Sequence, residues 1–264
     1  MNVVETTTDE GVRTINCNRP NAHNSLNAEL RLALRDAFLA AAAACDDPDH
    51  HKRVRAVLLR AEGPAFCAGQ DLKEQLQDTK AGTGKNKVVD EYNPMIAALL
   101  SIPVPVIAAI QGPAAGAGWG IAMACDFRIM SEAASFKGVF TGVGLSADCG
   151  LSASLANVVG TSRALELLIM DRKFLAKQAF AEQVVTALSM PSELDADAAA
   201  FARRLASGPT ASYRELKALL KGEERINASA AAEAEAQARH ADTCDHQEAV
   251  AAFVDKRNPI FHGY

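Results

Sequence analysis

Residues 105–126, PVIAAIQGPAAGAGWGIAMACD, contain the turn that decides the fold of this chain. An apolar run rich in Val and Ile leads into Gly112 and Pro113, and a turn of small residues at 116–118 opens directly into an apolar helix. The first N–H groups of a helix have no intrahelical acceptor and lie at its positive end. They therefore suit an anion or a carbonyl oxygen that gains negative charge, and the small side chains let a ligand approach the main chain.

A second turn makes the first one specific. The segment AFCAGQDL at 65–72 follows an apolar run at 54–59 that predicts a buried strand. These two turns, with NRPNAHNSL at 18–26 and AFVDKRNPIF at 252–261, resemble the enoyl-CoA hydratase/isomerase (crotonase) superfamily. The resemblance implies an α/β fold, a crotonase-like spiral of ββα turns with a C-terminal helical trimerisation region.

The resemblance also implies an oxyanion site made of main chain. In that superfamily two backbone N–H groups hold the thioester carbonyl of an acyl-CoA, and matching by position places them at Cys67 and Ala117. Because the backbone donates, the Cys and Ala side chains at these positions are not a departure from the pattern.

Further substrate contacts follow from the same resemblance. It implies contacts to coenzyme A and the acyl group from Ala22, Asn24, Ala68, Gln70, Asp71, Leu72, Gly116, Gly118, Trp119, Gly120, Phe140, Phe253 and Lys256. Three of these keep a second interpretation: Trp119 as core, Phe253 as helix packing and Lys256 as a solvated charge. Asp71 is also predicted to be the N-cap of the following helix. Coenzyme A enters as part of the substrate, so we expect no separate cofactor and no metal.

One departure concerns the chemistry. The hydratases of the superfamily add water with two glutamates, and the matching positions here are Gly120 and Phe140. Without a pair of carboxylates, no side chains at these positions can deprotonate a water while protonating the α-carbon. Simple hydration is therefore not expected.

One acid remains near these turns. Asp148, in GLSADCG, resembles the aspartate of the phenylacetyl-CoA ring-epoxide isomerase and dienoyl-CoA isomerase branches, which moves a proton. Val139 and Phe140 would surround it with apolar atoms and raise its pKa toward a useful value. The alternative is that Asp148 only caps the helix that follows it, and the pattern alone leaves both open.

Three functions remain compatible with the sequence. The first is a double-bond or ring isomerase that holds a thioester enolate in the oxyanion site and uses Asp148 as acid and base. The second is an enoyl-CoA hydratase with an atypical water site. The third is a relative that binds acyl-CoA without catalysis.

Composition excludes other classes of protein. The net charge of −5, with no dense basic stretch, argues against nucleic acid. No apolar run reaches the ~18 residues of a membrane span, and the N-terminus is polar, so we expect no membrane association and a cytoplasmic location. The six cysteines are scattered without a CxxC pair and are predicted to be reduced.

The chain is predicted to divide into a crotonase-like core at 1–192 and a helical region at 193–264, assembled as a homotrimer or a dimer of trimers. The alanine-rich face at 228–241 fits either a trimer contact or a plain surface helix. Within the polar segment 73–93, the tract KAGTGKNK at 80–87 is predicted to be a mobile loop over the pocket, and it is no phosphate-binding loop because Asn86 stands where Ser or Thr is required. The expected strands are 12–17, 54–60 and 104–110, with others near 126–130 and 184–187; the expected helices are 28–45, 194–206, 211–221, 228–242 and 247–256.

Overall fold

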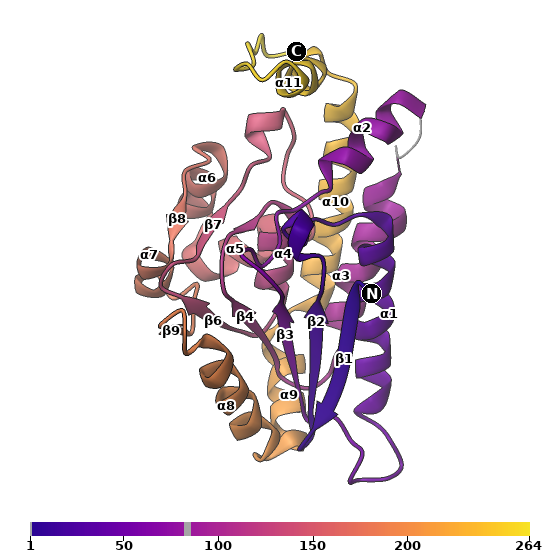
Figure 1. The fold of residues 1–264 in the computed structure, drawn as a ribbon, viewed down its shortest axis with the longest axis vertical. Coiled ribbons are helices and arrows are strands. Elements are labelled where there is room, and N and C mark those ends of the chain that lie inside the picture. The colour runs from indigo at the N-terminus through magenta and orange to yellow at the C-terminus, as the bar shows by residue number, and fades with distance from the viewer. Residues whose placement is uncertain (1, 82–85) are drawn as a thin grey trace.

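A six-stranded sheet forms the centre of the molecule (Figure 1). The computed structural model describes residues 2–81 and 86–264. The strand order is β1-β2-β3-β4-β6-β9, and every neighbouring pair is parallel except β1 and β2. The strands are β1 (Val4–Asp9), β2 (Val12–Cys17), β3 (Ala56–Ala61), β4 (Val106–Ile110), β6 (Phe127–Ser131) and β9 (Ala187–Ser189). The strands expected from the sequence are present, although β9 begins three residues later than expected, and β1 is an addition because all of its residues after the first are exposed and give no apolar signal.

Both faces of the sheet are covered, as its parallel strands require. On one face α8 packs against β2, β3, β4 and β6, and on the other α1 and α3 close the main core. Asn27 caps α1, where its side chain accepts from the Leu30 N–H at 3.0 Å. The helices of this part are α1 (Ala28–Ala44), α2 (Leu72–Ala81), α3 (Asn93–Leu100), α4 (Ala117–Ala124), α5 (Leu151–Val159), α6 (Thr161–Ile169) and α7 (Ala176–Ala181).

A second, three-stranded sheet lies beyond the carboxyl ends of the large one. Its order is β5-β7-β8, with β5 and β7 parallel. The bounds are β5 (Ala114–Ala115), β7 (Ser135–Lys137) and β8 (Phe174–Leu175), accompanied by the short helices η1 (Pro20–Ala22) and η3 (Thr141–Val143). Because β5 belongs to the glycine turn that precedes α4, this small sheet fixes the direction from which α4 starts.

The expected all-helical region is confirmed after residue 193. It consists of α8 (Leu194–Ala206), α9 (Thr210–Leu220), α10 (Glu223–Ala241) and α11 (Cys244–Val254). The alanine-rich face of α10 is buried within the same chain, where Ile226, Ala230 and Ala234 face α5 and α3. A contact between subunits is therefore not needed to explain that face.

The helix expected after Asp71 is confirmed as α2, and the mobile loop expected at 80–87 falls largely on residues 82–85, outside the described residues. Residues 72–81 form α2, and 88–92 form a π-helix, η2 (Val88–Tyr92), that continues into α3. Most residues of α2 are polar, and ion pairs rather than an apolar face attach it to the protein. Residues 82–85, within the glycine-rich tract, lie outside the described residues.

Candidate active site

The two glycine turns meet at the carboxyl ends of β3 and β4. A parallel bridge joins Cys67 to Ala114, with the Ala115 N–H donating to Cys67 O at 2.9 Å. The contact is so close that Gly118 has no room for a side chain, since a Cβ there would lie 2.4 Å from Cys67 O. Gly69 has φ +85 and faces Ala115 O in the same way, so the glycines permit the close approach of the turns.

The N–H groups that remain without an acceptor identify where an oxyanion could bind. Ala117 is the first residue of α4, and its N–H donates to no atom of the described residues. In the other turn the N–H groups of Cys67, Ala68 and Asp71 donate to Pro113 O (3.3 Å), His23 O (3.1 Å) and Leu26 O (3.3 Å). The Gly69 N–H is directed at the Cys67 thiol, and the Gln70 N–H has no acceptor among the described residues.

This changes the donor expected from the sequence. The Cys67 N–H is directed at Pro113 O, because it belongs to the bridge that joins the turns. Gln70 instead is half-buried and follows Gly69, whose Cβ position lies 3.7 Å from Ala117 N. Two donors without an acceptor among the described residues, Gln70 and Ala117, thus lie on the two turns that meet here.

The Asp148 carboxyl is buried beside these turns. Asp148 is 7 % exposed. Its carbonyl oxygen lies 3.4 Å from the Cβ position of Gly120, a residue of α4, the helix that starts at Ala117. Oδ2 accepts from Gln237 Nε2 at 3.4 Å, whereas Oδ1 has no hydrogen-bond partner among the described residues. Burial, supported by the negative charge of Glu233, raises the pKa of Asp148 to about 7, against smaller opposing effects of Cys149 and Gln237. Such a group can both take and return a proton near neutral pH.

The structure contradicts the capping interpretation of Asp148. The N-cap of α5 is Gly150, and no side chain of the preceding residues caps the helix. Asp148 contributes only its carbonyl oxygen, which accepts from the Leu151 N–H at 3.1 Å. The carboxyl is therefore not occupied by the helix end.

A different carboxylate satisfies that helix end. Glu233 of α10 accepts from the Gly150 N–H at 2.7 Å and the Ser152 N–H at 2.8 Å. One turn later, Gln237 binds Asp148 and donates to Ser146 O at 2.8 Å. The sequence reasoning missed both residues, although their four-residue spacing on the face that carries Ala230 is a helical signal for buried polar groups.

The positions of the two absent glutamates are filled. A Cβ at Gly120 would lie 2.6 Å from Cys149 Cβ, so the space for a side chain there is taken. Phe140 is 6 % exposed, and its ring lies 3.8 Å from the Cβ position of Gly116. Phe140 thus places apolar surface against the second turn.

The Trp119 expectation is corrected by its burial. The side chain is fully buried and stacks on Phe136, with ring centroids 5.3 Å apart, and Phe174 lies beside it. Trp119 therefore belongs to the core and does not form a pocket wall. It stands immediately after Gly118, where α4 turns one face toward the small sheet.

The first turn is held by polar contacts from both sides. Asp71 caps α2 through the Lys73 N–H at 3.0 Å, as expected, and pairs with Arg19 at 3.0 Å, which contributes to lowering its pKa. The Asn24 amide is fully buried and donates to the carbonyls of Glu62 and Ala65, both at 2.8 Å. These side chains are structural supports of the loops. Ala22 is half-buried in η1, and Ala68 and Leu72 are exposed.

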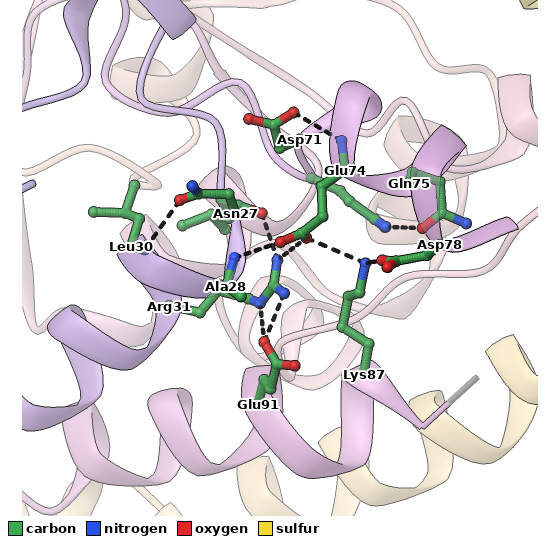
Figure 2. Close-up of polar contacts among 12 residues, drawn as sticks. Asn27, Ala28, Leu30, Arg31, Asp71, Glu74, Gln75, Asp78, Lys87 and Glu91 are labelled. Atoms are coloured by element: carbon green, nitrogen blue, oxygen red, sulfur yellow. Dashed lines mark hydrogen bonds and ion pairs between the residues drawn. The ribbon is translucent and has the colours of Figure 1, made fainter. Parts of the chain in front are cut away.

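Figure 2 shows a cluster of charged residues beneath the same turn, which we call the α2 clasp: Arg31, Glu74, Asp78, Lys87 and Glu91. The Arg31 guanidinium has no exposed surface and pairs with Glu74 at 2.8 Å and Glu91 at 2.6 Å. It also donates at 2.6 Å to Leu26 O, the acceptor of the Asp71 N–H. The clasp thereby holds α2 in place, and α2 begins two residues after the Gln70 donor.

The C-terminal helix lies at the same end of the molecule as α2 (Figure 1). It packs against η3, where His246 Nδ1 lies 2.7 Å from Val143 O. Phe253 and Lys256 are exposed, so the contacts expected of them with a nucleotide are not tested in a single chain. Two cavities of about 610 and 410 Å³ lie elsewhere. The first is lined by residues from β1, the β1–β2 turn and the segment after α1, and the second by residues from the end of α3 and from α9 and the turn after it.

Two classes of site are not found in the described part of the chain. Residues 2–81 and 86–264 contain no group of three or more His, Cys, Asp or Glu side chains placed to hold a metal ion. No helix within these residues has the length and apolar character to cross a bilayer.

Comparison with known proteins finds relatives that match nearly the whole chain. Residues 7–264 match the family described as enoyl-CoA hydratase/isomerase. A probable enoyl-CoA hydratase of Rhodobacter capsulatus is 33% identical over 96% of this chain and 95% of its own. The 1,2-epoxyphenylacetyl-CoA isomerase of Escherichia coli is 32% identical over 97% of this chain and 96% of its own. The crystal structure of an enoyl-CoA hydratase/isomerase from Pseudoalteromonas atlantica superposes with a TM-score of 0.86 at 30% identity, covering 98% of this chain and 100% of the other.

Proposed function

The chain belongs to the enoyl-CoA hydratase/isomerase family, and we propose that it isomerises an acyl-CoA thioester with Asp148 as acid and base. The observation that carries this proposal is the buried Asp148 carboxyl, with one oxygen unpartnered, beside two backbone donors that have no acceptor within the described residues. One carboxyl is sufficient for a proton shift, whereas adding water needs a second group to activate it. The reaction needs no cofactor beyond the coenzyme A portion of the substrate.

The proposed oxyanion site consists of the Gln70 and Ala117 N–H groups. They would bind the thioester carbonyl oxygen and stabilise the negative charge that develops there when a neighbouring carbon loses its proton. Ala117 adds the positive end of α4 to this effect, and the bridge between the turns holds both donors without reorganisation.

The proton then moves through Asp148. As a carboxylate it takes a proton from one carbon of the acyl group and becomes a neutral acid, while the bonding electrons pass into the enolate. The acid returns that proton to a different carbon, the enolate collapses to the thioester, and Asp148 is again a carboxylate. The substrate and product differ only in the position of a double bond or ring bond, so no water is consumed.

Hydration is the alternative that the names of several relatives favour. Against it stands the filled space at Gly120, because Cys149 lies where a first glutamate side chain would begin. Phe140 brings an apolar ring to the second position. A water between the turns would therefore have Asp148 as its one candidate base among these positions.

The Asp148→Asn variant tests the proposal. An amide cannot take the proton, so we expect isomerisation to fall by a factor of about 10² to 10⁴ with unchanged affinity for the acyl-CoA. The assay is a panel of 2-enoyl-, 3-enoyl-, dienoyl- and phenylacetyl-derived CoA esters, with exchange of the substrate α-proton in D₂O as a second readout. Full activity of Asp148→Asn would disprove the mechanism. Crotonyl-CoA hydration by the unmodified protein would favour the hydratase, and affinity without any turnover would favour a non-catalytic relative.

A further inference from the structure

One face of α10 brings two polar side chains to the loop that carries Asp148. Glu233 and Gln237 lie one helical turn apart, and they are 7 % and 9 % exposed. Glu233 contacts the residues that follow Asp148, whereas Gln237 contacts Asp148 itself and Ser146. Glu and Gln side chains are rarely buried unless they are paired, so the burial of both residues indicates a role in packing or in chemistry.

We propose that Glu233 and Gln237 are positioning residues that set the orientation of the Asp148 carboxyl and its affinity for a proton. This role rests on the acid–base function proposed for Asp148. It assigns part of the reaction's control to a helix of the C-terminal region, far along the chain from both glycine turns.

Gln237 determines which carboxyl oxygen faces the substrate. Its amide donates to Oδ2 at 3.4 Å and is itself anchored on Ser146 O at 2.8 Å, so the rotation of the Asp148 side chain is restricted. Oδ1 is left as the oxygen without a partner in the described residues, and it is the one able to exchange a proton. A donor to the carboxyl also favours its charged form.

Glu233 acts in the opposite direction. Its partners donate to it: the Gly150 N–H, the Ser152 N–H and the Ser152 hydroxyl. Burial raises the pKa of Glu233, and these donors oppose that shift because they favour its ionised form. Once ionised, Glu233 places a second negative charge near Asp148 and favours the protonated form of Asp148.

The other titratable groups near Asp148 carry no charge that could replace this effect. They are the Cys149 thiol next to it, the Cys67 thiol of the first turn and the Tyr92 phenol of η2. Burial raises the pKa of each of them, so all three are neutral across the range in which Asp148 titrates.

The two residues are therefore expected to shift the titration of Asp148 in opposite directions. Glu233→Gln removes the charge and should lower the pKa of Asp148 by roughly one unit, and Gln237→Leu removes a donor and should raise it by a similar amount. The measurement is the pH titration of ¹³C-labelled aspartate carboxyls by NMR in the full-length protein, with Asp148→Asn identifying the Asp148 signal.

Two control variants separate charge from structure. Glu233→Asp keeps the charge and weakens only the cap of α5, so the pKa of Asp148 should stay within a few tenths of a unit. Glu235→Gln removes an exposed charge from the same helix and should change nothing. If Glu233→Gln does not fold, the expected upward shift of the Asp148 pKa in Gln237→Leu still tests the proposal.

The pH dependence of isomerisation is the second readout. Because Asp148 must begin as a carboxylate, the acidic limb of the rate profile should move with its pKa, to lower pH in Glu233→Gln and to higher pH in Gln237→Leu. An unmoved Asp148 titration in both variants would overturn the inference. If the titration shifts but Asp148→Asn keeps full activity, the proposed function fails and the positioning stands.

Discussion

At the scale of single residues, the buried Asp148 carboxyl destabilises the folded protein at neutral pH. Such a cost is expected of a residue that serves function rather than stability. Burial raises its pKa from 3.8 to about 7, so at neutral pH the folded protein holds a carboxyl that would be fully ionised in the unfolded chain. A group with a raised pKa binds its proton more tightly in the folded state. Its contribution to stability is therefore present below pH 4 and is lost as the pH rises toward 7.

Asp148→Asn should consequently stabilise the protein at alkaline pH. The shift corresponds to at most about 4 kcal/mol, because each unit is worth about 1.4 kcal/mol. We expect urea unfolding to show the variant more stable than the unmodified protein at pH 8, with a difference that shrinks as the pH falls to 4. A difference independent of pH would mean that the carboxyl is not desolvated.

Gly120 shows how a missing side chain can be structural. A Cβ there would lie 2.6 Å from Cys149 Cβ, so Gly120→Ala should cost about 1–3 kcal/mol through overpacking. Gly142→Ala is the matched control, since its Cβ meets nothing closer than Asp171 Oδ2 at 3.5 Å. Chemical denaturation measures both.

The same contact can be tested by removing its partner. Cys149 has a positive φ of 59°, a conformation that glycine adopts without strain, so Cys149→Gly removes the Cβ and fits the backbone. In that background Gly120→Ala should lose most of its cost. An undiminished cost in the double variant would show that some other contact excludes a side chain at this position.

At the scale of elements, α2 is attached to the protein by charge. Its ion pairs to Arg31 and Lys87 replace the apolar face that holds other helices, and Glu74 joins α2 to the start of α1 through the Ala28 N–H at 2.6 Å. Because α2 begins at the residue after Asp71, any loosening of the helix reaches the Gln70 donor. The stability of α2 and the binding of the thioester carbonyl by the Gln70 N–H are thereby linked.

Arg31→Met should expose this link. Removing the guanidinium leaves Glu91 without this partner and Glu74 with Lys87 alone, which we expect to cost about 3 kcal/mol in unfolding free energy. The turnover number should fall as well, because the Gln70 N–H loses its fixed position. Arg35→Met, on the same helix with a half-exposed ion pair to Asp36, should cost less than about 1 kcal/mol and leave turnover unchanged.

At the scale of the whole molecule, α9 leaves apolar surface uncovered. Leu216, Leu219 and Leu220 are 52 %, 79 % and 80 % exposed, and together they place three leucines on one short helix. A large exposed apolar patch is typical of a surface that another protein covers. We therefore expect this helix to contribute to the trimer or pair of trimers, in place of the alanine-rich face of α10.

Charges placed on that surface test the assembly. The unmodified protein should be a trimer or hexamer by light scattering at micromolar concentration, and Leu219→Glu with Leu220→Glu should reduce its mass. Leu39→Glu, on α1 with a side chain 50 % exposed, should leave the mass unchanged. A monomeric unmodified protein would contradict the expected assembly.

Much of this molecule could be predicted from local sequence alone. The order of strands and helices follows from apolar runs and glycine turns. Burial of one face makes apolar residues recur with the period of the helix or strand, and this pattern is visible in neighbouring residues. The two turns and the helical region after residue 193 were visible in the same way. The absence of paired glutamates and the role of Asp148 as an acid came instead from the resemblance to the superfamily, because the local pattern alone also allowed Asp148 to be a helix cap.

Tertiary structure alone decided which atoms can act. Whether an N–H remains available depends on acceptors that other segments supply, and Pro113 O takes the Cys67 N–H while nothing in the described residues takes that of Gln70. Trp119 lies in the core because Phe136 arrives beside it. Glu233 stands 83 residues from the helix end that it satisfies. Such contacts produce no periodic pattern in the local sequence, because they arise only when distant parts of the chain are packed together.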